Sequence, residues 1–509
     1  MATLSVATIL AENARRRPGK TALVEGELRL TFAEVWRRSL ARAGALTGAL
    51  GVRPGDRVAL MAPNTAEFPV AYFAVTAAGG VVVPVHLLLS AGEVEHVLRD
   101  SGAALLLVHP AQAETGRAAA EALGVRVVTL GEEFDKLAAD AEPLPSYVTR
   151  AADDPAVIFY TSGTTGVPKG AVLSHFNIVM NATVNAFDAN DIRADDVALG
   201  ALPLFHAFGQ TVSLNSTWRA GATLVLLPRF DAARAIELMV EEGVNTFHGV
   251  PTMYVALTAA AAQAERLPGL RICISGGASL PVAVLERFEE AFGAKIYEGY
   301  GLSETSPTAT VNQPLFGTKA GTIGHPLWGV DVEIARAETE DRIELLPAGE
   351  LGEVVIRGHN VFSGYLGRPE ATAEAVVDGW FRTGDLGTKD DEGFLRIVDR
   401  KKDVIIRGGY NVYPREVEEV LMRHPGIAQV AVIGLSDELH GEEVCAVVVP
   451  KPGGVPDAAA LTEWSKEYLG RHKYPRRVEF TDALPLGPSM KVLKRELRAR
   501  YTEKRADQA

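Results

Sequence analysis

The sequence predicts an α/β fold of parallel sheets covered by helices on both faces, followed by a small β-rich part and a compact α+β unit. From the N-terminus to about residue 300, short apolar strands alternate with amphipathic helices, which is the rhythm of βαβ units. From about Gly349 the pattern changes to short strands separated by glycine turns. After Asp399, helix and strand patterns alternate again toward the C-terminus.

Length and composition restrict the classes of protein that need to be considered. At 509 residues the chain is too long for one compact core, so we expect two or more domains. Apolar residues make up 47% and charged residues 23%, as in ordinary globular proteins. The net charge of −13 argues against a nucleic-acid partner and against an anionic membrane surface. An anionic ligand must therefore be held by local donors.

Cysteine usage and hydropathy indicate a cytoplasmic protein. Cys273 and Cys445 lie far apart in apolar runs, so we expect neither a disulfide framework nor a metal cluster. The N-terminus has no basic residue before its short apolar run and does not resemble a secretory signal. The uncharged stretch between Glu67 and Glu93 is long enough to span a bilayer, but glycines 79 and 80 and Pro84 interrupt it. We expect a buried helix, a glycine turn and a core strand there, and no integral membrane segment.

The first third of the chain predicts helices and strands in turn. A helix is expected over residues 4–17, and Thr31 with Glu34 forms a capping box that starts the next helix. A break at Pro63 precedes the helix of the uncharged stretch. The expected strands cover residues 22–24 and 28–30 as a hairpin-like pair, then 57–60, 105–108 and 126–130.

A second series begins with a polar loop at residues 160–170, with the sequence Tyr-Thr-Ser-Gly-Thr-Thr-Gly-Val-Pro-Lys-Gly, after the apolar run 156–159. Two glycines allow a tight turn, four hydroxyls add donors, and Lys169 adds a positive charge, which together suit a polyphosphate. It is not a Walker A loop, because Pro168 and Gly170 occupy positions that need Gly and Ser or Thr. Alone, such a loop could also be a solvated polar turn.

The elements that follow predict where a ligand would bind. Strands are expected at residues 197–202, 223–227, 246–250, 270–275 and 295–298, with helices at 232–242 and 281–292. Loops at 205–209, 249–251, 275–278 and 299–304 follow these strands, and in an open parallel sheet such loops meet in one cleft. Later strands at 353–356, 380–381 and 394–397 predict a barrel-like subdomain. The C-terminal unit is expected to contain a helix over 415–422, strands 430–433 and 444–449, and a helix over 458–469.

Five motifs in order resemble the signature of adenylate-forming enzymes, the superfamily of acyl- and aryl-CoA synthetases, firefly luciferase and peptide-synthetase adenylation domains. They are the loop at 160–170 and residues 297–304, 380–385, 399–403 and 491–497. The resemblance covers nearly the whole chain. It implies a large N-terminal domain (1–399) with doubly wound parallel sheets and a small β-barrel subdomain (about 349–399). It further implies a hinge at 400–402 and a small mobile α+β lid domain (403–509).

The resemblance also implies an activity. An AMP-forming acyl-CoA synthetase joins a carboxylic acid to AMP with release of pyrophosphate and then transfers the acyl group to coenzyme A. The carboxylate is itself the nucleophile, and the sequence contains no G-x-S-x-G elbow. Lys491 would bridge the carboxylate and the α-phosphate, and Glu304 with Thr161 would hold Mg²⁺. His206 would either gate the acyl pocket or be a core histidine.

Several groups of residues are expected to bind ATP or coenzyme A on the basis of this resemblance. Tyr300 would face the adenine, Asp385 and Arg400 the ribose, and two glycines of the lid the pantetheine thiol. Taken singly, each could instead be a core, capping or surface residue. The full set is Thr161, Ser162, Gly163, Thr164, Thr165, Gly166, Lys169, Gly276, Gly277, Ala278, Glu298, Gly299, Tyr300, Gly301, Ser303, Asp385, Arg400, Gly408 and Gly409.

The substrate is less well defined by the sequence. The segments 205–210, 246–250 and 275–278 carry no Arg or Lys, which disfavours a dicarboxylate. The run 399–418 looks most like medium- and long-chain fatty acyl-CoA ligases, so a fatty acid is the expected substrate and an aryl acid of the cinnamate or benzoate type the alternative. A stand-alone adenylation enzyme serving a carrier protein and an inactive acyl-binding homologue remain open. The family usually has Gly before the terminal lysine, where this chain has Met490. A monomer or homodimer is expected.

Overall fold

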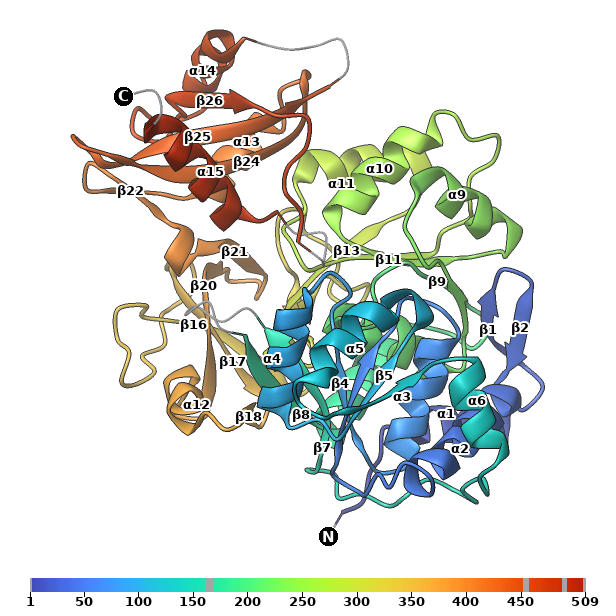
Figure 1. The fold of residues 1–509 in the computed structure, drawn as a ribbon. Coiled ribbons are helices and arrows are strands. Elements are labelled where there is room, and N and C mark those ends of the chain that lie inside the picture. Colours follow the sequence, from blue (N-terminus) through green and yellow to red (C-terminus); the bar gives the residue numbers. More distant parts are fainter. Residues whose placement is uncertain (1, 162–167, 452–456, 488–491, 507–509) are drawn as a thin grey trace.

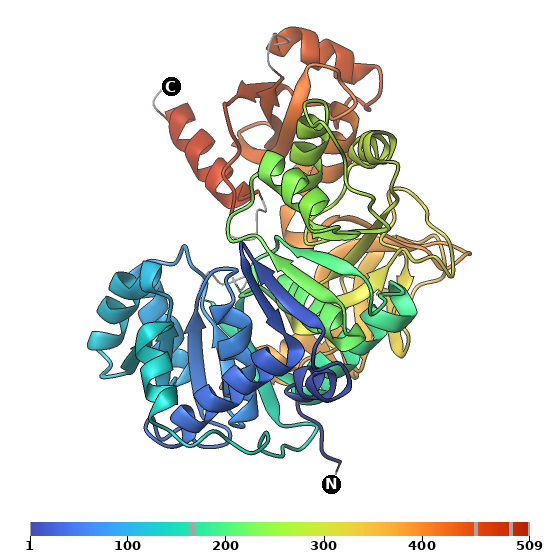
Figure 2. The ribbon, with the colours of Figure 1, turned by 90° about the vertical axis from the view of Figure 1, so that its right-hand side faces the viewer.

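The computed structural model describes residues 2–161, 168–451, 457–487 and 492–506, and these residues form four sheets (Figure 1). Two large sheets with their helices make up most of the N-terminal part. A smaller antiparallel sheet follows, and the fourth sheet belongs to a C-terminal unit. That unit lies at one end of the molecule, far from the N-terminus, in both views (Figures 1 and 2). The expected α/β class is confirmed.

The first large sheet has seven strands in the order β18-β8-β7-β4-β3-β5-β6. Its inner strands are parallel, and nearly every residue in β3, β4 and β5 is buried, as expected for strands covered on both faces. The strands are β3 (Arg57–Met61), β4 (Val81–Pro84), β5 (Leu105–Val108), β6 (Arg126–Thr129), β7 (Pro155–Thr161), β8 (Lys169–Ser174) and β18 (Gly364–Tyr365). The helices beside it are α2 (Phe32–Thr47), α3 (Glu67–Ala77), α4 (Ala91–Ser101), α5 (Ala113–Glu121) and α6 (Glu132–Ala139).

The uncharged stretch forms the buried helix, glycine turn and strand that the sequence predicts. All residues of α3 after Glu67 are buried, Gly79 has a φ of +78°, and β4 follows. In the described part of the chain, no helix is both long enough and apolar enough to cross a bilayer. The capping box of α2 is also confirmed, because Thr31 and Glu34 exchange both hydrogen bonds.

The second large sheet has nine strands in the order β15-β14-β13-β12-β11-β9-β10-β1-β2. The N-terminal hairpin joins this sheet, with β1 parallel to β10. The strands are β1 (Thr21–Glu25), β2 (Leu28–Thr31), β9 (Val197–Gly200), β10 (Thr223–Leu226), β11 (Thr246–Gly249), β12 (Ile272–Ser275), β13 (Ile296–Gly301), β14 (Thr308–Val311) and β15 (His325–Pro326). Its helices include α7 (His175–Val184), η2 (Asn185–Ala189), η3 (Gly209–Ser216), α8 (Thr217–Ala220), α9 (Ala232–Glu241), α10 (Pro251–Ala261) and α11 (Val282–Phe292).

One helix starts later than the sequence predicts. The helix expected from residue 4 is α1 (Thr8–Arg16). Ser5 ends the preceding segment, because its hydroxyl accepts a hydrogen bond from the amide of Ala7 and its carbonyl accepts one from the hydroxyl of Thr8. Such local side-chain bonds compete with helix formation.

The barrel-like subdomain is an open, antiparallel half-barrel. Its strands pair in the order β16-β17-β20-β19, and β21 pairs with β20. The strands are β16 (Val330–Ala335), β17 (Gly352–Gly358), β19 (Val376–Val377), β20 (Trp380–Lys389) and β21 (Leu395–Arg400).

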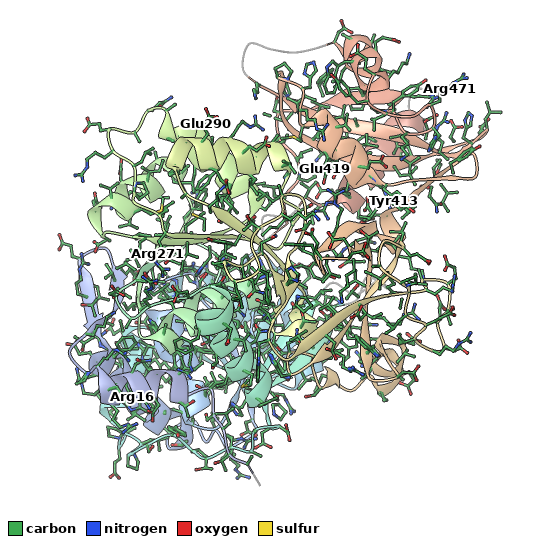
Figure 3. All side chains as sticks on the ribbon, turned by 180° about the vertical axis from the view of Figure 1, so that it is seen from behind. Arg16, Arg271, Glu290, Tyr413, Glu419 and Arg471 are labelled. Atoms are coloured by element: carbon green, nitrogen blue, oxygen red, sulfur yellow. The ribbon has the colours of Figure 1, made fainter. Side chains whose placement is uncertain are left out.

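The C-terminal unit packs helices on a mixed five-stranded sheet. One side of this unit, on which Tyr413 and Glu419 lie, faces the rest of the chain, and Arg471 lies away from that side (Figure 3). Its helix at residue 458 ends at Lys466, three residues earlier than expected. The elements are β22 (Ile405–Arg407), β23 (Tyr410–Val412), α13 (Pro414–Leu421), β24 (Ile427–Asp437), β25 (Gly441–Pro450), α14 (Ala458–Lys466), β26 (Arg477–Phe480) and α15 (Lys494–Ala506).

Candidate functional site

The two ends of the polar loop pair with each other and lead to a buried carboxylate. Thr161 ends β7 and Lys169 begins β8, and the two residues are partners in the antiparallel ladder. The hydroxyl of Thr161 lies 3.4 Å from Oε1 of Glu304, and Lys169 Nζ lies 5.3 Å from the centre of the Tyr365 ring. Residues 162–167, which include Ser162, Gly163, Thr164, Thr165 and Gly166, lie outside the described residues.

Glu304 is held in a 3-10 turn, η4 (Ser303–Thr305), and is only 7% exposed. Its Oε1 accepts a hydrogen bond of 2.9 Å from the hydroxyl of Tyr365. Burial and the neighbouring carboxylate raise the pKa of Tyr365, so this hydroxyl stays protonated and donates. No cluster of three or more His, Cys, Asp or Glu side chains in the described ranges could bind a metal ion. Glu304 with Thr161 therefore fits Mg²⁺ only as a partial ligand set, which suits an ion that also binds phosphate oxygens.

Asp385 joins two other residues expected at the nucleotide. Tyr300 donates a hydrogen bond of 2.5 Å from its hydroxyl to Oδ2 of Asp385, and Arg400 Nε lies 3.0 Å from Oδ1. Asp385 in β20 and Arg400 in β21 are ladder partners, so the strand register brings them together. The negative charge of Asp385 raises the pKa of Arg400, and burial with the same charge raises the pKa of Tyr300. The carboxylate therefore remains an acceptor between two donors.

Tyr300 borders a cleft whose empty volume, including the part open to solvent, is about 560 Å³, whereas Glu304 and Asp385 are not among the residues that line it. Glycines at the ends of β12 and β13 allow neighbouring groups to approach the backbone closely. A Cβ on Gly276 would lie 3.2 Å from the Phe208 ring, and one on Gly301 would lie 1.8 Å from the carbonyl oxygen of Pro307. His206 also borders the cleft, and its Nδ1 accepts a hydrogen bond of 3.2 Å from the amide of Phe208. The sequence-predicted residues that line the cleft are His206, Gly276, Gly277, Gly299, Tyr300, Gly301 and Ser303.

Glu298 and Ala278, which are expected to bind the nucleotide, do not line the cleft. Glu298 is buried, accepts a hydrogen bond of 3.0 Å from the amide of Leu280, and lies 3.9 Å from the guanidinium of Arg415 in the C-terminal unit. Burial raises the pKa of Glu298 to about 7. Ala278 is not among the residues that line the cleft.

The expected residues of the lid lie in two places. Gly408 and Gly409 form the exposed turn between β22 and β23, with φ of +57° and +81°. This backbone conformation favours glycine. Lys491 lies outside the described residues. Lys494, three residues further on, contacts Glu418 of α13 at 2.7 Å, within the C-terminal unit.

Some site residues cannot be found by local pattern. Tyr365, which binds Glu304, comes from β18, the edge strand next to β8. Asn185 and Val212 line the cleft and belong to π-helical segments that no local sequence pattern predicts. Only the packing of distant segments brings these side chains to the cleft.

Comparison with known proteins identifies two matching family models and several similar full-length proteins. Residues 10–366 match the model of AMP-binding enzymes, and residues 416–491 match that of the AMP-binding enzyme C-terminal domain. A feruloyl-CoA synthase from an Amycolatopsis species is 42% identical over 490 residues, covering 96% of this chain and 97% of the relative. A long-chain-fatty-acid–CoA ligase of Bacillus subtilis is 36% identical over 542 residues, covering 97% and 94%. The crystal structure of the anthranilate CoA ligase AuaEII in complex with anthranoyl-AMP matches with a TM-score of 0.93 at 28% identity and covers 99% of each chain.

Proposed function

The chain belongs to the family of AMP-binding enzymes and is an AMP-forming acyl-CoA synthetase, and from this premise we propose that it activates an aryl carboxylic acid in the cleft that residues 299–303 line. One observation carries the proposal. The segment 299–303 lines the cleft and joins the two carboxylates, because Tyr300 donates to Asp385 and the next residue after the segment, Glu304, contacts Thr161. This arrangement suits ribose at one end of the segment and phosphates at the other.

The first half-reaction needs positioning and charge neutralisation. A carboxylate oxygen of the acid attacks the α-phosphorus of ATP, and the bond from that phosphorus to the pyrophosphate oxygen breaks. Donors that offset the charge at phosphorus would therefore lower the barrier. We assign this role to Lys169 and Lys491. Mg²⁺, held by Glu304 and Thr161, would neutralise charge on the phosphates.

The second half-reaction transfers the acyl group to sulfur. The thiol of coenzyme A attacks the carbonyl carbon of the adenylate, the thiol proton is released, and AMP leaves. We propose that residues 403–509 form a mobile lid that turns about residues 400–402, so that the glycine turn at Gly408 and Gly409 reaches the cleft in this step. In the structure, Arg415 ties this unit to the half-barrel, since it donates to the carbonyl of Ile397 at 2.8 Å and, through its amide, to Asp399 at 2.9 Å.

Two features support an aryl acid over the fatty acid that the run 399–418 suggested. The relative at 42% identity is named for an aryl acid, and the relatives named long-chain-fatty-acid–CoA ligases are 34–37% identical. The cleft also has a short apolar wall of Phe208, Val212, Ile274 and Val311 that fits a flat ring. A medium- or long-chain fatty acid is the second candidate, because full-length fatty-acid relatives match the chain throughout.

A panel of acids tests the proposal. The purified enzyme is supplied with ATP, Mg²⁺ and coenzyme A and with cinnamates, benzoates or alkyl acids of graded length, and AMP and thioester are measured. We expect AMP and thioester in equal amounts with aryl acids. Turnover with alkyl acids alone would favour the second candidate, and adenylate formation without use of coenzyme A would indicate a carrier-protein substrate. No AMP with any acid would indicate an inactive homologue.

A further inference from the structure

A π-helix lies beside the cleft. This segment, η3 (Gly209–Ser216), is buried along its whole length, and its Val212 lines the cleft. A Cβ on Gly209 would lie 2.1 Å from the carbonyl oxygen of Pro203, so only glycine allows the helix to start so close to that backbone. π-helical turns are rare and frequently occur at functional sites.

A buried histidine packs against this helix. His248 in β11 is fully buried, and its Nδ1 lies 3.2 Å from Oγ of Ser213, the residue after Val212. Its Nε2 has no hydrogen-bond partner among the residues that the structure describes. A buried polar atom without a partner is destabilising, so a ligand atom that pairs with Nε2 would be stabilised.

The strand register places His248 on the cleft side of the sheet. β11 and β12 are parallel, and His248 is the ladder partner of Ile274, so both side chains point to the same face. Ile274 lines the cleft. Phe247, the preceding residue, points to the opposite face and packs on Tyr254 with ring centres 5.3 Å apart. His248 thus lies on the strand next to Ile274 and on the same face of the sheet.

The unpaired atom bears on the kind of acyl group. An unpaired Nε2 of His248 on the same face as the apolar side chain of Ile274 does not suit the end of an alkyl chain, because burying it against methyl groups leaves it unpaired. It suits a ring that carries a polar substituent. Ser275 also lines the cleft with an Oγ that lacks a partner within the described ranges, but it follows Ile274 in β12 and so points to the opposite face.

We propose that His248, oriented by its hydrogen bond with Ser213, recognises a hydroxyl group on the ring of the aryl acid. This inference rests on the proposed function. A phenolic hydroxyl both donates and accepts, so it can pair with Nε2 whichever nitrogen of the imidazole carries the proton. A ring hydrogen or a methyl group leaves Nε2 unpaired.

The charge of the site agrees with a neutral partner. Burial lowers the pKa of His248 to about 4, so the imidazole is neutral at pH 7 and offers no positive charge to a second carboxylate. The recognised group is therefore a hydroxyl and not an anion, which agrees with the lack of Arg and Lys in the segments expected around the acyl group.

Three acids of matched shape test the proposal: 4-hydroxycinnamate, 4-methylcinnamate and cinnamate. We expect the wild-type enzyme to prefer the hydroxyl compound over the methyl compound by about 10- to 100-fold in kcat/KM for pyrophosphate release. In His248→Leu the ratio should fall to about one, because the loss of kcat/KM falls on the hydroxyl compound. His248→Gln, which keeps a polar group, should restore part of the preference. Ser213→Ala should reduce the ratio in part, and Ser213→Thr should restore it.

The chain offers a matched control. His175 is also fully buried, its Nε2 likewise has no partner among the described residues, and burial lowers its pKa to about 4. It lies at the start of α7, and its Nδ1 accepts a hydrogen bond from the amide of Val6 instead of pairing with a residue of η3. His175→Leu should therefore leave the hydroxyl preference unchanged. Thermal denaturation of each variant establishes that it is folded.

Each outcome decides the proposal. An unchanged ratio in folded His248→Leu, or an equal loss with all three acids, would overturn it, as would a wild-type enzyme without hydroxyl preference. Pyrophosphate release with alkyl acids alone would overturn ring recognition and leave the ligase assignment intact. If no acid releases pyrophosphate, the ligase assignment fails, and calorimetry then decides: weaker binding of 4-hydroxycinnamate to His248→Leu alone supports the proposal, and equal or absent binding overturns it.

Discussion

Replacing Asp385 by alanine is expected to weaken ATP binding about 100-fold. The carboxylate is 3% exposed and already accepts from Tyr300 at 2.5 Å and Arg400 at 3.0 Å, so it is held in a fixed orientation. Hydrogen bonds to a charged group contribute about 1.5–3 kcal/mol each. Two ribose hydroxyls bound to this carboxylate therefore contribute roughly 3 kcal/mol or more, which corresponds to about two orders of magnitude in Kd.

The same substitution also affects stability, because Tyr300 and Arg400 lose their shared acceptor. Breaking a fully buried ion pair costs about 3–5 kcal/mol, but the Arg400 side chain is 48% exposed, so solvent reduces this cost. Asp385→Asn is the milder variant, since it keeps an oxygen that accepts from Tyr300 and removes only the charge. We expect this variant to remain folded and to bind ATP about 10-fold more weakly, close to the loss of one charge-assisted bond.

Calorimetric titration with a non-hydrolysable ATP analogue measures the affinity, and thermal denaturation reports the fold. Asp331→Asn is a matched control, because Asp331 pairs with Arg357 at 2.8 Å in the same half-barrel but both side chains are more than half exposed. Its affinity for the analogue should be that of the wild type. Wild-type affinity in folded Asp385→Asn and Asp385→Ala would refute the assignment of Asp385 to the ribose.

Four further predictions concern the C-terminal unit and its contact with the rest of the chain. Lys491→Ala should slow adenylate formation about 100-fold or more and largely spare thioester formation from supplied adenylate. Lys494→Ala should instead lower the melting temperature, because Lys494 pairs with Glu418 at 2.7 Å. A larger loss of adenylate formation in the Lys494 variant would contradict this assignment. Glu298 has a pKa raised by burial to about 7, so its stabilising effect is complete below about pH 4.5 and is lost as the pH rises through 7. The free energy of unfolding of Glu298→Gln should therefore rise relative to that of the wild type between about pH 4.5 and pH 7, by up to roughly 3 kcal/mol, and level off above pH 7. A constant difference would argue against the raised pKa. Lys402→Pro should still release pyrophosphate but fail to form thioester from supplied adenylate and coenzyme A, because proline fixes φ near about −65°. Near-normal rates of both half-reactions would show that the lid does not turn at Lys402.

Local sequence patterns determined the secondary structure and the family. The capping box at Thr31, the glycine turn at Gly79 and the buried strands beside it follow from hydrogen-bonding capacity, backbone freedom and hydropathy over a few residues. The five ordered motifs were enough to indicate an adenylate-forming enzyme, because each is a contiguous loop whose residue types suit a phosphate, a ribose or a metal ion. The Asp385–Arg400 contact was implied by the ribose role that both residues share.

Only the tertiary structure decided which distant segments meet. The hairpin of β1 and β2 joins the nine-stranded sheet through β10, about two hundred positions later in the chain, and no local pattern encodes that pairing. Tyr365 reaches Glu304 because an edge strand adds to β8, and His248 meets Ser213 because a π-helix packs on β11. Short-range periodicity specifies the face that a side chain occupies. The neighbour on that face is set by the packing of whole sheets and helices, and in this protein those neighbours determine the shape and polarity of the cleft.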